Sequence, residues 1–254
     1  MTSVRTRVFA LLLVSLNYGC GGGTSTSNKL DPSGDYLTNF PLTENPISEG
    51  GKWVNGGTVG LDWTDVSATP GLAVGHETGA DFTDSTAVLQ NLTWAPDQKA
   101  SAVVFSTGES VDNCSQEVEL RLRTFISANS ITGYEINYEF STNSTGYMQI
   151  VRWNGPVGNF EVLHSFSGPQ YGVTNGDTVS ATIVGNVITA YKNGMQQGQV
   201  TDSTFSTGSP GMGFNLNNTL SGCSGTNATY GFSSFNAIDS TQGSFQAGLS
   251  RKPL

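Results

Sequence analysis

Charged residues are scarce in this chain, and cationic ones are the scarcer kind. Charged residues make up 12% of the 254 positions, with 11 Lys and Arg against 20 Asp and Glu, and the formal net charge is −9. A nucleic-acid backbone is bound by clustered Lys and Arg, and the cations here are scattered along the sequence. We therefore expect no nucleic-acid partner.

Long apolar runs are missing as well. The run from Val8 to Leu16 follows Arg5 and Arg7 and is too short to span a bilayer. A basic start before a short apolar stretch is typical of a secretory signal peptide, which we place over residues 1–20. The chain is therefore expected to be exported, with a flexible linker over residues 21–42 that begins Gly-, Ser- and Thr-rich.

The residues around Cys20 resemble the lipobox of bacterial lipoproteins. Gly19 fits the position before the cysteine, whereas Asn17 stands where an aliphatic residue is usual. The resemblance implies that Cys20 is acylated and holds the protein to the membrane of a bacterial cell envelope or surface. An ordinary signal peptide, with secretion of the protein, is the alternative.

Only three cysteines and two histidines are present, and no zinc-site spacing occurs. Beyond Cys20 the sequence has Cys114 and Cys223, and in an exported protein two remaining cysteines most simply form one disulfide. The bridge would close a loop of about 110 residues and stabilise the fold by roughly 4 kcal/mol. We predict a structural disulfide.

Helical periodicity is absent, and short alternating runs take its place. Between residues 43 and 238 these runs are separated by turn signals, such as the Asn193-Gly194 pair that favours a type I′ turn. This pattern predicts one all-β domain over residues 43–238, a sandwich or a barrel. Residues 239–254 are expected to form a C-terminal tail.

Three stretches then resemble the concanavalin A-like lectin/glucanase superfamily, in its laminin-G-like bacterial branch. They read "YMQIVRWNGPVGNFEVL", "NGDTVSATIVGNVITAYKNGMQQGQVTDSTFSTGSPGMGF" and "YGFSSFNA". The resemblance is close over residues 133–238 and weaker over 45–132. It implies an antiparallel jelly-roll β-sandwich of two curved sheets, a fold that hosts lectins, hydrolases, lyases and adhesion modules alike.

The stretch "YEINYEF", residues 134–140, sets three polar side chains on one face of a strand: Glu135, Asn137 and Glu139. The β-glucan hydrolases of the superfamily carry Glu-x-Asp-x-Glu at this spacing. The resemblance implies Glu135 as nucleophile and Glu139 as acid/base, two carboxyls that a retaining enzyme holds ~5–5.5 Å apart. Asn137 departs from the motif, because it cannot hold a negative charge, so a solvated or ligand-contacting sheet face is the favoured interpretation.

The next strand carries aromatic and amide side chains on one face, with Tyr147, Gln149 and Trp153 in phase. Sugars are often held by stacking on an exposed aromatic ring and by hydrogen bonds to nearby polar groups. We expect a glycan on the concave sheet, with Tyr147 or Trp153 stacking on a sugar; core packing is the alternative for Trp153. Polar contacts are expected from Glu135, Asn137, Gln149 and Arg152.

An acidic, turn-rich stretch, "GHETGADFTD", contains Asp81 and Asp84. Carboxylates suit Ca²⁺, which several sandwich domains of this superfamily bind, so these residues are candidate ligands for a structural ion. Neither residue lies in a defined calcium loop, and solvated loop acids are the alternative.

Taken together, the sequence predicts an exported carbohydrate-binding protein that recognises a polysaccharide or other glycan. One alternative is a polysaccharide-cleaving enzyme, a glycoside hydrolase or lyase of the same fold. The other alternative is a surface adhesion module that binds protein.

Overall fold

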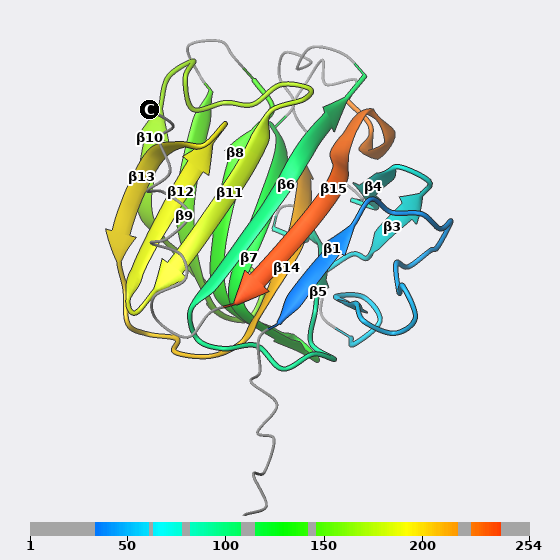
Figure 1. Cartoon of the computed structure of the whole chain (residues 1–254), viewed down its shortest axis with the longest axis horizontal. Helices are drawn as coiled ribbons and strands as arrows, with labels where there is room; N and C mark the ends of the chain where they lie inside the picture. The colour runs from blue at the N-terminus through cyan, green and yellow to red at the C-terminus, as the bar shows by residue number, and fades with distance from the viewer. Residues whose placement is uncertain are drawn as a thin grey trace, which may run out of the picture. The chain divides into compact units, whose positions relative to one another are not determined.

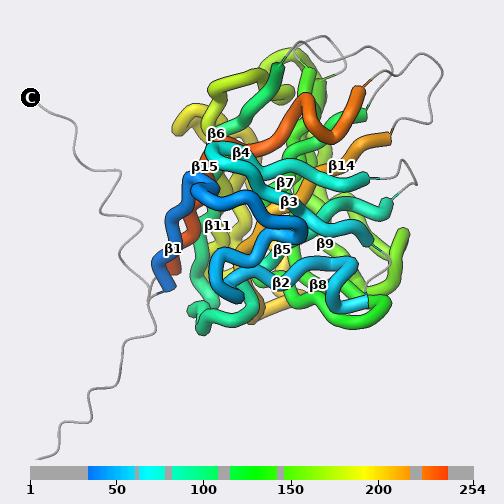
Figure 2. The backbone as a smooth tube through the Cα atoms, turned by 90° about the vertical axis from the view of Figure 1, so that its right-hand side faces the viewer, coloured from blue at the N-terminus to red at the C-terminus, as the bar shows by residue number. Residues whose placement is uncertain are grey.

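A computed structural model describes residues 34–60, 63–77, 82–107, 115–141, 146–217 and 225–239 of the chain. These residues form an all-β sandwich of two antiparallel sheets, and the helical content is a single 3-10 turn, η1 (Asn227–Thr229). Figure 1 shows the first sheet in front of the second, and Figure 2 shows the two layers from the side. The predicted jelly-roll β-sandwich is confirmed.

The first sheet has the strand order β13-β12-β11-β6-β15-β4-β3, and β1 pairs with β15 beside this path. Its strands are β1 (Asp35–Thr38), β3 (Val66–Thr69), β4 (Leu72–Gly75), β6 (Gln98–Ser106), β11 (Thr178–Val184), β12 (Val187–Lys192), β13 (Met195–Thr201) and β15 (Tyr230–Asp239).

The second sheet has the order β10-β9-β8-β7-β14-β5-β2. Its strands are β2 (Val54–Asn55), β5 (Ser85–Val88), β7 (Ser115–Ser127), β8 (Ser130–Glu139), β9 (Tyr147–Gly155), β10 (Phe160–Ser167) and β14 (Ser209–Asn217). The longest of these, β7 and β8, lie side by side near the middle of the sheet.

The core lies between the sheets, and strand alternation decides which side chains enter it. On β8, Tyr134, Ile136 and Tyr138 are fully buried in this core. The two phenol groups are also paired: Tyr134 donates to the Asp202 carboxylate at 2.6 Å, and Tyr138 donates to the Tyr191 carbonyl at 3.0 Å. The alternate residues of β8 must therefore point away from the first sheet.

The domain begins earlier than predicted. Strand β1 lies inside the predicted linker over residues 21–42, where it pairs with β15, and Phe40 just after it is fully buried. Tyr36 turns inward and packs edge-on against Trp53. The predicted boundary at residue 43 is thus wrong: the alternation "DYLT" is too short to stand out among neighbouring Gly, Ser and Pro.

Several predicted features lie outside the described residues. They are Cys20 with its lipid anchor, the Cys114–Cys223 disulfide, and Asp81. All of these stay predictions. Within the described residues, no helix has the length and apolar character needed to cross a membrane.

Candidate functional site

The outer face of the second sheet, turned away from the first sheet, carries an unusual number of ionisable side chains. On β7 it presents Glu117, Glu119 and Arg121, because the intervening Val118 and Leu120 are buried in the core. On β8 the same alternation turns Glu135, Asn137 and Glu139 outward. Charged residues occupy most of the middle of this face.

The register of β7 and β8 sorts these six residues into three cross-strand pairs. The pairs are Arg121 with Glu135, Glu119 with Asn137, and Glu117 with Glu139. Side chains directly opposite each other in an antiparallel pair have Cβ atoms about 4.5–5.5 Å apart. Each outward carboxyl of β8 therefore meets a different partner on β7.

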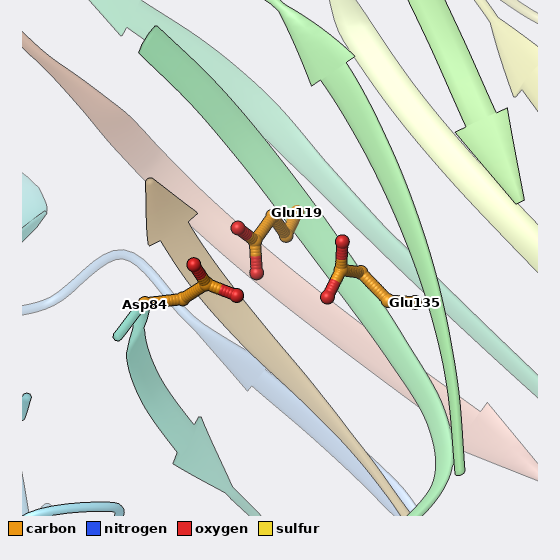
Figure 3. A group of neighbouring side chains, drawn as sticks. All are labelled: Asp84, Glu119 and Glu135. Atoms are coloured by element: carbon orange, nitrogen blue, oxygen red, sulfur yellow. The ribbon is translucent and has the colours of Figure 1, made fainter. Parts of the chain in front are cut away.

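At one end of the face, Arg121 is the centre of a buried ionic cluster. Its guanidinium donates to Glu135 at 2.9 Å, to Asp84 at 3.3 Å and to Glu119, and all four side chains are buried. Trp153 donates its indole N–H to Glu135 at 2.6 Å. Figure 3 shows the three carboxyl groups pointing toward one another from separate segments.

Burial sets the protonation of this Arg121 cluster. It raises the pKa of the Asp84 and Glu119 carboxyls well above their usual range, and the mutual repulsion of the carboxylates raises both further. Burial by itself would lower the pKa of Arg121, but the carboxylates around it raise that pKa. The guanidinium therefore stays charged, and the three carboxyls compete for one cation.

Room for the cluster depends on a glycine in the neighbouring strand. Gly213 of β14 lies opposite Glu119, and a Cβ added there would overlap the Glu119 carboxyl and contact the Arg121 guanidinium. This close approach requires the absence of a side chain at position 213.

Apolar side chains cover the cluster from outside. We call them the outer apolar cluster: Trp63, Val88, Ile126, Ile131, Val151 and Trp153. The Trp63 ring packs edge-on against Trp153 with centroids 4.5 Å apart, and it also lies over the Arg121 guanidinium carbon at 4.9 Å. This half of the face is closed to a ligand the size of a sugar.

Trp153 therefore does not match the prediction of a stacking platform. It is only 3% exposed, and its ring packs within the outer apolar cluster. The alternative interpretation, that Trp153 is a packing residue, is correct, because the segment that carries Trp63 folds over it.

The other end of the face is more open. Glu139, Tyr147 and Gln149 are each partly exposed, whereas Glu117 is nearly buried beneath them. Tyr147 donates its hydroxyl to Glu117, and the Gln149 amide donates to Ser165 at 3.4 Å. One oxygen of Glu139 has no hydrogen-bond partner among the described residues.

Burial also raises the pKa values at this open end. It raises the pKa of Glu117 to about 7, against the opposing effect of the Tyr147 hydroxyl, and it raises the pKa of Glu139 to about 7. Both carboxyls are therefore close to half-protonated near neutral pH.

The proposed pairing of Glu135 with Glu139 finds no support in this arrangement. Four residues along a strand correspond to roughly 13 Å between Cα atoms. Between them, Asn137 is 4% exposed and donates its amide to Glu135 at 3.0 Å. Glu135 belongs to the buried end of the face and Glu139 to the open end.

Arg152 also differs from its predicted role. It lies on the opposite face of β9 from Tyr147 and Gln149, and it forms ion pairs with Asp202 and Glu161. It cannot contact a ligand together with those residues. Of the candidate Ca²⁺ ligands, Asp84 lies in the Arg121 cluster, and its predicted companion falls outside the described residues.

Sequence reasoning missed Glu117, Glu119 and Arg121 as members of this face. Their signal is present in "SQEVELRLR", residues 115–123, where they alternate with Val118 and Leu120. It is the same period of two that identified the polar face of residues 134–140.

No protein-family model and no curated protein sequence matches the chain. Among solved structures, carbohydrate-binding module CBM66 from Bacillus subtilis is similar with 13% identity and a TM-score of 0.48, over 74% of this chain and 92% of that one. The metal-free carbohydrate recognition domain of Emp46p is similar with 12% identity and a TM-score of 0.49, over 80% of this chain and 95% of that one. Porphyranase B from Zobellia galactanivorans is similar with 12% identity and a TM-score of 0.48, over 80% of this chain and 90% of that one. Similarity this low carries no argument about function.

Proposed function

We propose that this protein is an exported glycan-binding β-sandwich that holds its sugar at the open end of the outer face. The residues proposed to touch the sugar are Glu139, Tyr147, Gln149 and Ser165, named here the open polar row. The observation that supports the proposal is the partly exposed Glu139 residue, which has one buried, unpartnered carboxyl oxygen and lies beside partly exposed hydroxyl and amide groups. Such convergent polar groups fit the hydroxyls of a saccharide.

The charges at this end favour a neutral or amino-bearing sugar. Glu117 and Glu139 face each other across the two strands, and a sulfated or uronic-acid polysaccharide would be repelled by them. Carboxyl oxygens accept hydrogen bonds from sugar hydroxyls, and Tyr147 adds a ring beside them.

Glycan-array binding followed by titration calorimetry tests the proposal. We expect the wild-type chain to bind a neutral glycan and the Glu139→Gln and Gln149→Ala variants to bind it about threefold to tenfold more weakly. Glu161→Gln is the matched control, because Glu161 lies on the opposite face and should leave affinity unchanged. Absence of glycan binding, or equal affinity in all variants, would contradict the proposal.

A second candidate function, glycoside hydrolysis, is favoured by the Glu117–Glu139 pair. The two residues are directly opposite in the register, and both have a pKa of about 7. The Tyr147 hydroxyl donates to Glu117 and favours its ionised form, as a nucleophile or base requires. Glu139 has an unpartnered oxygen and suits the role of the protonated acid.

Release of reducing ends from the bound polysaccharide separates the two candidates. If the protein is a hydrolase, Glu139→Gln should lower release at least about a hundredfold while binding falls far less. A wild-type chain that binds and releases nothing is a lectin. Recovery of a protein partner in place of a glycan would indicate an adhesion module.

The export and anchoring part of the proposal rests on the N-terminal sequence. Acylation at Cys20 predicts that the chain fractionates with membranes and that Cys20→Ser moves it to the soluble exported fraction. A soluble wild-type chain would favour secretion after an ordinary signal peptide.

A further inference from the structure

Buried polar atoms without a hydrogen-bond partner gather in the Arg121 cluster. Among the described residues they include two oxygens that can bind a cation, Oε1 of Glu119 and Oγ1 of Thr86. Nε of Arg121 is also unpartnered, but it is an N–H donor and not a metal ligand. Glu119 and Thr86 are both 0% exposed. Buried polar groups are nearly always paired in proteins, so this concentration points to a missing partner.

Thr86 lies on the same outer face as the cluster, on the far side of β14 from Glu119. On β5, Ala87 and Leu89 pack in the core, whereas Val88 belongs to the outer apolar cluster, so alternation turns Thr86 to the outer face. In the register, Gly213 lies between Thr86 on one side and Glu119 on the other. The glycine has no side chain, so the hydroxyl and the carboxyl face each other across it.

The charges of the cluster are also unbalanced. The carboxyls of Asp84, Glu119 and Glu135 share one guanidinium, and when ionised they leave two negative charges without a cation. Unpaired buried charge is costly, and a divalent cation would neutralise the excess.

The spacing of the oxygens fits a single ion. One oxygen from each of the three carboxyls lies within 4.8 Å of the others, as the converging groups of Figure 3 illustrate. Oxygens that bind Ca²⁺ at about 2.3–2.6 Å are at most roughly 5 Å apart. The set consists of oxygens alone, which suits a hard cation over zinc or copper.

We infer that Asp84, Glu119 and Glu135, with the Thr86 hydroxyl as a further ligand, form a buried site for a hard divalent cation, Ca²⁺ by preference. The ion would join β7 and β8 to the residue that precedes β5, beneath the outer apolar cluster. This site is separate from the open polar row and does not depend on glycan binding.

Luminescence of Tb³⁺, a Ca²⁺ substitute, tests the site in the wild-type chain. Trp63 lies over Arg121, so an ion in the cluster should show tryptophan-sensitised emission. After chelator treatment we expect emission that saturates at one Tb³⁺ per chain and is displaced by Ca²⁺. Trp63→Phe, which removes no ligand, should lower the emission while Ca²⁺ binding persists.

Variants then assign the ligands by calorimetry with Ca²⁺. Glu119→Gln should weaken binding at least about tenfold, and Thr86→Val several-fold, because each removes one oxygen ligand. The control is Asp35→Asn, an exposed acid on β1 of the other sheet, which should leave Ca²⁺ affinity unchanged.

Three results would overturn the inference. The first is a lack of saturable, Ca²⁺-displaceable Tb³⁺ emission from the wild-type chain, which needs no variant to fold. The second is unchanged Ca²⁺ affinity in Glu119→Gln. The third is a free energy of unfolding that rises when the pH is lowered but does not rise when Ca²⁺ is added. That result would mean that protons, and not a metal ion, neutralise the excess negative charge of the three carboxyls.

Discussion

Glu135 and Glu139 have the same side chain and lie on the same face of the same strand, yet their surroundings differ. Glu135 is 3% exposed and accepts hydrogen bonds from Arg121 and Trp153. Glu139 is partly exposed, and one of its oxygens has no partner among the described residues. The neighbouring strand and the covering segment, more than the local sequence, decide what each carboxyl can do.

The two ends of the face also differ in how they offset the cost of burying carboxyl groups. At the buried end, Arg121 supplies positive charge to three carboxyls. At the open end, Glu117 and Glu139 face each other and burial raises both pKa values to about 7. A structural role therefore fits the first end, and a ligand-contacting role fits the second.

The largest effect is expected from Arg121→Met. It leaves three buried carboxyls without a cation and should lower the free energy of unfolding by about 3–5 kcal/mol at pH 8. The loss should be smaller at pH 5, where Asp84 and Glu119, whose pKa values are raised, take up protons more readily. Urea unfolding at both pH values measures it.

Arg152→Met is the matched control for this change. Arg152 also pairs with two carboxylates, but its side chain is 18% exposed, so its removal should cost about 1 kcal/mol or less. Equal losses in the two variants would remove the distinction between the buried cluster and an ordinary surface ion pair.

The sandwich was predictable because its signal is local. Alternation in "YEINYEF" shows which side chains of β8 enter the core and which point out, and Tyr134, Ile136 and Tyr138 are buried as that pattern requires. The same reasoning applied to residues 115–123 would have found the outward charges of β7.

The composition of the site was not predictable in this way. Which residue of β7 faces Glu139 depends on strand register, which connects segments about 20 residues apart and is not encoded in either strand alone. The closing of one half of the face depends on Trp63, which lies far from Trp153 in sequence. A single strand pattern therefore suggested a Glu135–Glu139 pair, where the sheet instead places Glu117 opposite Glu139.

A smaller effect is expected from Trp153→Phe, which removes the indole donor to Glu135. A hydrogen bond to a charged group contributes about 1.5–3 kcal/mol, and the unfolding free energy should fall by that amount. Trp53→Phe is the comparison, because the hydrogen bond that it removes, to the Tyr36 hydroxyl, joins two neutral groups. Its free energy of unfolding should fall by only about 0.5–1.5 kcal/mol. The reverse order in chemical denaturation would show that the bond from Trp153 to Glu135 contributes less to stability than the neutral bond from Trp53 to Tyr36.

The smallest effect concerns pH. The folded-state pKa of Glu139, about 7, is above the unfolded value of about 4.3, so the stability that it contributes is present at low pH and lost as the pH rises to 7. Glu139→Gln should flatten this decline, by less than about 1 kcal/mol because solvent screens a partly exposed group. Glu77 has a pKa of about 9 and is present in both the wild type and Glu139→Gln, so the free energy of unfolding of both should continue to fall toward pH 9. Urea unfolding at pH 5, 7 and 9 checks this, and identical slopes in the two chains would contradict it.

The most direct test of the divided face compares the free energies of unfolding of Glu135→Gln and Glu139→Gln at pH 8. The same chemical change is made twice on one strand. We predict that Glu135→Gln loses about 1.5–3 kcal/mol, because Arg121 and Trp153 lose a charged acceptor, and that Glu139→Gln is as stable as the wild type or slightly more stable. A loss in Glu139→Gln as large as that in Glu135→Gln would contradict the account, since both ends of the face would then be structural.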